Sequence, residues 1–281
     1  MKFKIFTLFP EIFESFLTTG LLGKAVTNKV FEVKTINWRD NFGVGNYKKI
    51  DDKPFGGGTG LVLQVDPIFE ALQKSGANPT IREKKLLPHN HDFWEQEQLL
   101  PTKKAIIHLT PRGYPMTQQV VEWLSGFDEI SVLCGRYEGF DERVNNFVDL
   151  ELSVGNFVLN GGEVGAMCLV ESVARLLPDF LVKNTSAMHD SFSSNLNSYS
   201  EQAEFVIGKN NLKKPQETTV LQQPKNPFDQ QNWIKNVLPF IEHPQYTRPS
   251  VWQTQNQSLE VPNLILEGDH KKIASWRKKW Y

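Results

Sequence analysis

The stretch EISVLCGRYEG at residues 129–139, followed by SVGNFVLNGGEVGAM at 153–167, decides which fold the sequence predicts. The first begins as a short apolar run bounded by glycine, which is typical of a buried strand. The second leads into a helix over 163–177, whose apolar residues recur at helical spacing: Val164, Met167, Val170, Ala174 and Leu177. Pro178 ends this helix. The order strand, glycine turn, helix indicates an α/β unit.

The flanking sequence extends this alternation. Strands are expected at residues 2–9 and 105–110 and in the short runs 148–155 and 156–162. Helices are expected at 10–20, at 120–124, and from Asp66, as N-cap, through Lys74. Together these elements predict an α/β fold with a mainly parallel sheet.

The composition is that of a globular protein, with 40% hydrophobic and 22% charged residues. The formal net charge of −1 excludes a global basic field, so any RNA binding needs a local patch. Residues 1–13 alternate charged and apolar side chains, and no run approaches the ~20 apolar residues of a membrane span. We therefore expect a cytoplasmic protein without a signal peptide or membrane contact. Cys134 and Cys168 are expected to be buried thiols, since no zinc-ligand spacing is present.

The character of the sequence changes twice along the chain. Residues 77–104 are polar and interrupted by proline, which predicts a surface insertion. After a first domain at 1–181, residues 182–236 have the composition of a long polar linker. A small helical domain is expected at 237–281, and its basic end carries Trp276 and Trp280 among lysines and arginines. Such a surface suits RNA phosphates, although a solvated helix end explains it equally well.

Three glycine-bearing turns are expected after strands, at TPRG 110–113, GRYEG 135–139 and NGGE 160–163. Any one of them is explained by a tight turn, but three at the ends of parallel strands favour a ligand pocket. GGGTG at 56–60 resembles a phosphate-binding loop, yet Leu61 follows where Lys-Ser/Thr is needed, which disfavours nucleoside triphosphate binding.

Longer motifs carry a specific resemblance. FTLFPEIF, GLLGKAV, DDKPFGGGTG, IHLTPRG, LCGRYEGFDERV, SVGNFVLNGGEVGAM, ESVARLLP, HDSF and QYTRP occur here in one order. In these motifs the chain resembles the bacterial tRNA (guanine-N1)-methyltransferases of the TrmD type, in the SPOUT superfamily. The likeness covers nearly the whole chain apart from 77–104 and about 193–236.

The resemblance implies a trefoil-knotted methyltransferase domain, which periodicity alone does not predict because knots are exceptional. It also implies that loops of the knot bind S-adenosyl-L-methionine, mostly through backbone groups. The matching positions here are Leu109, Thr110, Pro111, Gly135, Tyr137, Glu138, Val154, Gly155, Asn156, Phe157, Val158, Leu159, Gly161 and Gly162. Family members often have Tyr where His108 and Phe157 stand, and we expect these changes to tune the pocket.

The chemistry needs a base, because guanine N1 is a poor nucleophile until its proton leaves. The resemblance assigns this role to Asp190, and it assigns to Arg175 the stabilisation of negative charge on guanine O6. From the residues alone, a helical ion pair with Glu171 explains Arg175, and an N-cap explains Asp190. His189 stands where the family commonly has Glu, and a protonated histidine there would lower the pKa of Asp190.

The resemblance further implies a tRNA substrate and a homodimer with a composite active site. Magnesium dependence is implied by the family only, since the sequence has no dedicated ligand cluster. Two alternatives stay open: a SPOUT RNA methyltransferase with another target nucleotide, and a catalytically silent RNA-binding homologue.

Overall fold

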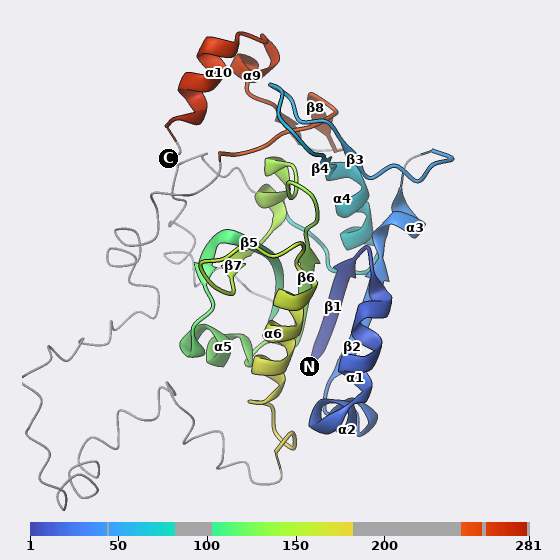
Figure 1. Ribbon diagram of the computed structural model, residues 1–281. Helices are drawn as coiled ribbons and strands as arrows, with labels where there is room; N and C mark the ends of the chain where they lie inside the picture. The colour runs from blue at the N-terminus through green and yellow to red at the C-terminus, as the bar shows by residue number, and fades with distance from the viewer. Residues whose placement is uncertain (44, 82–102, 182–242, 255–256, 280–281) are drawn as a thin grey trace, which may run out of the picture.

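The structure is a computed structural model that describes residues 1–43, 45–81, 103–181, 243–254 and 257–279 (Figure 1). Its centre is a five-stranded sheet with the order β2-β1-β6-β5-β7, in which every neighbouring pair is parallel. The strands are β1 (Lys2–Thr7), β2 (Glu32–Asn37), β5 (Lys104–Pro115), β6 (Glu129–Cys134) and β7 (Leu150–Ser153). The prediction of an α/β fold with a mainly parallel sheet is confirmed.

Helices cover both faces of this sheet, because side chains alternate between its faces along each strand. Ile107 and Val132 face the helices α1 (Glu14–Thr18), α2 (Gly20–Thr27), α5 (Gln118–Leu124) and α6 (Glu163–Ala174). Ile106 and Leu133 face the opposite core, built with the helices α3 (Trp38–Phe42), α4 (Val65–Lys74) and the 3-10 turn η3 (Glu142–Phe147). The sheet therefore lies between two apolar cores.

Smaller elements lie at the carboxyl ends of the strands. A two-stranded antiparallel ribbon pairs β3 (Asp51–Asp52) with β4 (Val62–Leu63). The C-terminal part contains the hairpin of β8 (Val251–Gln253) and β9 (Ser258–Glu260), and then α9 (Asn263–Leu266) and α10 (His270–Arg277). Figure 1 shows α9 and α10 at the end of the molecule away from the N-terminus of β1.

Several predicted elements have other bounds in the structure. The first strand ends at Thr7, and the predicted helix 10–20 is divided into the 3-10 turn η1 (Pro10–Phe13), α1 and the start of α2. The predicted end of the strand 105–110 is wrong, because β5 continues to Pro115. Leu109 and Tyr114 both pair with Leu152, so residues 110–113 bulge out of the ladder.

Four further predictions are wrong for tertiary reasons. Residues 156–162 form no strand but an exposed loop. Asp66 does not cap α4, whose N-cap is Gln64, because its carboxylate accepts a 2.5 Å hydrogen bond from Trp252 Nε1. Cys134 is buried as expected, but Cys168 lies exposed on α6. Val164, expected on the apolar face of that helix, is 49% exposed.

A buried polar clasp, Asp141, Arg143 and Thr247, fixes the C-terminal segment to the sheet domain. Arg143 donates to Asp141 from Nε at 2.8 Å and from Nη2 at 2.9 Å. The Thr247 amide donates to Asp141 Oδ2 at 2.6 Å, and the Thr247 carbonyl accepts from Arg143 Nη2 at 2.8 Å. Buried charges are stable only when paired and hydrogen-bonded in this way.

An aromatic contact supports the clasp. Trp252 of β8 is buried, and its ring centroid lies 4.9 Å from that of Phe69 and 5.9 Å from that of Phe147. Residues 243–254 are thus part of the same packed body as the sheet. The boundaries of the predicted domains at 181 and 237 stay a prediction, since residues 182–242 lie outside the described part.

In the described ranges, no helix has the length and apolar character needed to cross a membrane.

The clasp gives a prediction about stability. Asp141→Asn keeps the shape of the side chain but leaves the Arg143 charge buried and uncompensated, so we expect a loss of about 3–5 kcal/mol in the free energy of unfolding. Lys74→Ala removes an exposed ion pair with Glu70 and serves as control, with an expected loss below about 0.5 kcal/mol. Urea denaturation measures both, and equal losses in the two variants would contradict this account.

Candidate functional site

The carboxyl ends of β5, β6 and β7 meet the first turn of α6. A β-carbon at Gly165 would lie 3.3 Å from Leu109 Cδ1 and 3.5 Å from Val154 Cγ1. The structure thus brings together the ends of β5 and β7 at the base of the helix. Thr110 is half-buried and Pro111 exposed in the bulge that follows Leu109. In parallel α/β sheets, this edge is where ligands bind.

Backbone contacts join the loop after β6 to the loop before α6. The Gly162 amide donates to the Gly135 carbonyl at 3.0 Å, and Arg136 pairs with Gly161 as an isolated bridge. A β-carbon at Gly162 would lie 2.7 Å from Cys134 Cα and 3.1 Å from the Gly135 nitrogen. Glycine is therefore required at 162 by this close approach, since its φ of −77° suits any residue.

The loop 135–139 has an unusual backbone at its centre. Tyr137 has a φ of 58°, a left-handed conformation that is uncommon for a residue with a side chain. Its exposed ring reaches Arg39 of α3, whose Nη2 donates to the tyrosine hydroxyl at 3.1 Å. The Glu138 amide donates to the Leu61 carbonyl at 3.1 Å. Arg39 and Leu61 thus hold the loop 135–139 in place.

The loop 154–162 exposes apolar side chains. Phe157 is 55% exposed, Val158 84% and Leu159 38%, while Asn156 is exposed as well. The Phe157 ring lies against Gly155, where a β-carbon would collide with it. Together with Val164, these side chains form an apolar surface beside the glycine contacts. Neighbouring exposed apolar residues of this kind mark a binding surface.

A buried ion pair under the two loops was missed by sequence reasoning. Arg136 Nη2 lies 2.9 Å from Glu163 Oε2, and Thr7 Oγ1 donates to Glu163 Oε1 at 2.8 Å. The Arg136 guanidinium stacks on Phe9, 4.6 Å from the ring centroid. The only local signal was an acidic residue in the first turn of a helix, which the helix dipole favours. Glu163 thereby connects the ends of β1 and β6 to α6.

A family model described as tRNA (Guanine-1)-methyltransferase TrmD matches residues 1–225 and 220–280. The chain belongs to the tRNA (guanine-1)-methyltransferase family of the TrmD type. Membership makes it an enzyme that methylates guanine in tRNA, and it implies the trefoil knot of the SPOUT fold.

Individual relatives agree with the family match. A tRNA (guanine-N(1)-)-methyltransferase of Endomicrobium trichonymphae is 31% identical over 277 residues, covering 99% of this chain and 92% of that protein. One from Sorangium cellulosum is 34% identical over 281 residues, covering 99% and 88%. The crystal structure of tRNA (m1G37) methyltransferase from Aquifex aeolicus has a TM-score of 0.51 and 32% identity, over 65% of this chain and 72% of that one.

His108 belongs to a buried polar network below the loops. Its Nδ1 lies 3.0 Å from Asn145 Oδ1, and its ring meets Phe140 edge-on. Arg112 donates to Glu142 at 2.6 Å and to Glu151 at 3.3 Å. Burial raises the pKa of Glu142, and the Arg112 charge opposes that rise. The histidine thus packs as part of the TrmD scaffold.

Of the two expected catalytic residues, the structure describes Arg175 but not Asp190. Arg175 is the half-buried C-cap of α6, and its amide donates to the Glu171 carbonyl. It is therefore at the opposite end of α6 from Gly162, about 20 Å away along the helix axis. Figure 1 shows α6 running back along the sheet in this way. Asp190 lies outside the described residues.

Within the described ranges, no group of three or more His, Cys, Asp or Glu side chains could hold a metal ion.

The close approach at Gly162 gives a second prediction. Gly162→Ala inserts a methyl group against the backbone of β6, so we expect a loss of about 1–3 kcal/mol in the free energy of unfolding. Gly126→Ala is the control, because a β-carbon there would meet Trp123 O at an ordinary 3.4 Å. Guanidinium denaturation distinguishes the two, and a Gly162→Ala variant as stable as Gly126→Ala would refute the required approach.

Proposed function

We propose that the chain transfers a methyl group from S-adenosyl-L-methionine to N1 of the guanosine immediately 3′ of the anticodon, position 37 of tRNA. The TrmD family supplies the reaction, and the Aquifex aeolicus structure is of an m1G37 enzyme. The observation that carries the proposal is the joining of the loops 135–139 and 154–162 through glycine backbone at the edge of a parallel sheet. We propose a cytoplasmic location, where tRNA is modified.

The residues at this edge fit the cofactor. The cofactor supplies an electrophilic methyl group on a positively charged sulfur. The missing side chains at Gly161 and Gly162 make room for contacts within the chain, so a ligand at these loops would meet peptide groups and not side chains at Gly135, Gly161 and Gly162. Exposed Phe157 and Leu159 provide apolar area beside these groups for an adenine ring. We propose that these loops, together with Leu109 and the bulge after it, hold the cofactor.

Asp190 and Arg175 are proposed for the guanine side. The Asp190 carboxylate would accept the N1 proton, which frees the N1 electron pair for attack. Negative charge then develops on O6, where the Arg175 guanidinium would stabilise it. We propose His189 as the residue that sets how basic Asp190 is, since a charged neighbour shifts a carboxyl pKa.

The geometry of α6 supports a homodimer. In one chain Gly162 and the Arg175 end of the helix are about 20 Å apart, which exceeds the reach of an arginine side chain to a guanine beside the cofactor. A second copy whose α6 lies alongside would bring its own Arg175 and Asp190 to these loops. It would also cover the exposed Val158 and Val164. We therefore propose an active site composed of two subunits.

The first test of the proposal is mass spectrometry of nucleosides after incubation with unmodified tRNA and labelled cofactor. We expect N1-methylguanosine at position 37. Asp190→Asn should reduce its formation by about 100-fold or more, because the general base is lost, while cofactor affinity stays within about twofold. Asp179→Asn is the matched control at an exposed carboxylate and should keep wild-type turnover.

Other products decide against the proposal. A different methylated base would indicate a SPOUT methyltransferase with another target, and no product would indicate a silent RNA-binding homologue. Wild-type turnover in Asp190→Asn would remove this residue from the mechanism. Magnesium dependence, proposed from the family alone, is tested by adding a chelator to the same assay.

The composite site makes a separate prediction. Asp190→Ala lacks the base and Gly135→Val obstructs the cofactor loop, so each homodimer should be inactive. After unfolding and refolding as a mixture, half the dimers are mixed and have one intact site, so about a quarter of wild-type activity should return. If one subunit supplied a whole site, the mixture would stay inactive, and circular dichroism must show that both variants refold.

A further inference from the structure

The glycine loop 55–60 lies between the C-terminal part of the chain and the loop 135–139. The Phe55 amide donates to the Tyr246 carbonyl at 2.7 Å. Arg277 of α10 donates from Nη2 to the Gly57 carbonyl at 2.5 Å and to the Gly56 carbonyl at 3.3 Å. The loop therefore presents carbonyl oxygens to the Arg277 guanidinium. A phosphate-binding loop does the opposite and presents backbone amides to an anion.

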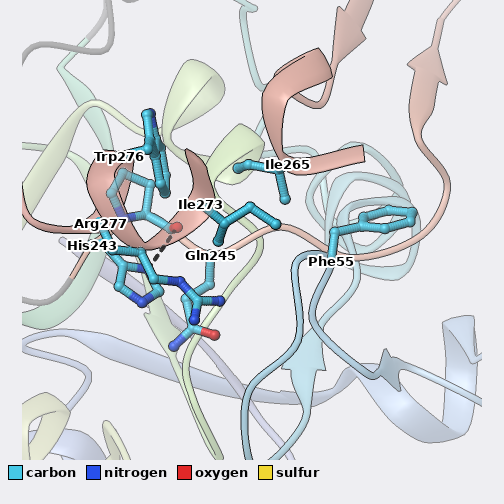
Figure 2. Close-up of a pocket in the computed structure, with 8 residues that line it drawn as sticks. Phe55, His243, Gln245, Ile265, Ile273, Trp276 and Arg277 are labelled. Carbon is cyan, nitrogen blue, oxygen red and sulfur yellow. Dashed lines mark hydrogen bonds between the residues drawn. The ribbon is translucent and has the colours of Figure 1, made fainter. Parts of the chain in front are cut away.

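Apolar packing holds the same side of the loop. A β-carbon at Gly56 would lie 3.0 Å from Ile265 Cγ2 and 3.6 Å from Ile273 Cδ1, and the φ of Gly56 is 77°. Ile273 and Arg277 come from successive turns of α10, and Figure 2 shows Ile273 extending toward Phe55. Helices α9 and α10 thus press directly on the glycine loop.

The other end of the loop touches Glu138. A β-carbon at Gly60 would collide with the Glu138 side chain, including Cγ at 2.6 Å and Cδ at 2.9 Å. The residues after Gly60 run alongside the loop 135–139. The Leu61 carbonyl accepts a hydrogen bond from the Glu138 amide, and the Leu63 amide donates to the Gly139 carbonyl. Glu138 can take its position only because residue 60 has no side chain.

We infer that the glycine loop 55–60 is a positioning element for Glu138: Gly60 leaves the space for the Glu138 side chain, and Arg277 holds the loop from α10. This inference rests on the proposed function, in which Glu138 belongs to the cofactor site. It assigns a role to the GGGTG motif and to Arg277. The loop 135–139 can then hold Glu138 in place for the cofactor only while α10 is folded against the glycine loop 55–60. Gly60 and Arg277 are positioning residues and touch no reacting atom.

Titration calorimetry with S-adenosylmethionine, without RNA, tests the Glu138 end of the loop. Gly60→Ala should weaken binding about fivefold or more, because its methyl group displaces the Glu138 side chain. Gly268→Ala is the control for the backbone strain of an alanine with a positive φ. Its φ of 75° matches the 78° of Gly60, and no described atom lies within 4 Å of the added carbon. Equal affinity in the two variants overturns the inference.

A double-mutant cycle separates positioning from general damage. Once Glu138→Ala has removed the side chain, Gly60→Ala has nothing to displace, so the double variant should bind as Glu138→Ala alone. Additive losses would mean that the two residues act independently, and the inference would be wrong. A wild-type protein that binds no S-adenosylmethionine would instead contradict the proposed function.

Arg277 tests the other end, and it keeps the inference testable if Gly60→Ala does not fold. Arg277→Ala should weaken cofactor binding about threefold or more in the absence of RNA, with partial recovery in Arg277→Lys. Lys278→Ala removes the same charge from an exposed neighbour and should leave this affinity unchanged. If Arg277→Ala binds the cofactor as Lys278→Ala does, Arg277 has no role in positioning the loop.

Discussion

The approach of Gly162 to the end of β6 is the constraint on which the candidate site depends. A hydrogen bond from the Gly162 amide to the Gly135 carbonyl joins two loops that are far apart in the sequence. The first turn of α6 then lies directly on the sheet, with Glu163 buried against Arg136 and Thr7. With a side chain at 162, α6 would have to move away from β6 and the ends of three strands would no longer meet.

A second constraint ties the C-terminal part to this edge. The buried carboxylate of Asp141 pairs with Arg143 and accepts from the Thr247 amide, and Thr247 Oγ1 donates to the Lys53 carbonyl at 2.8 Å. The chain before the glycine loop is thus held by the segment that leads into β8. An enzyme that must align a cofactor with a base in a folded RNA benefits from such rigid coupling.

The sequence predicts much of this fold because its central elements follow simple patterns. Apolar spacing predicts the strand at 129–135, which the structure has at Glu129–Cys134, and the helix from 163, while long motifs indicate the family. The same reasoning wrongly predicts a strand at Phe157-Val158-Leu159, which lie exposed in a loop. An apolar run indicates that its side chains are buried, but not whether residues of this chain or a binding partner bury them. Asp66 was assigned to a helix cap, whereas its partner is Trp252, 186 residues away.

The contacts of the site were less predictable for the same reason. Thr7 and Glu163 are 156 residues apart, and Gly56 and Arg277 are 221 apart, so no local pattern joins them.

Hydrogen exchange with and without S-adenosylmethionine tests the central claim that the loops 135–139 and 154–162 form the cofactor site. The account predicts slower exchange in both loops and in the glycine loop 55–60; slower exchange confined to other parts of the chain would contradict it.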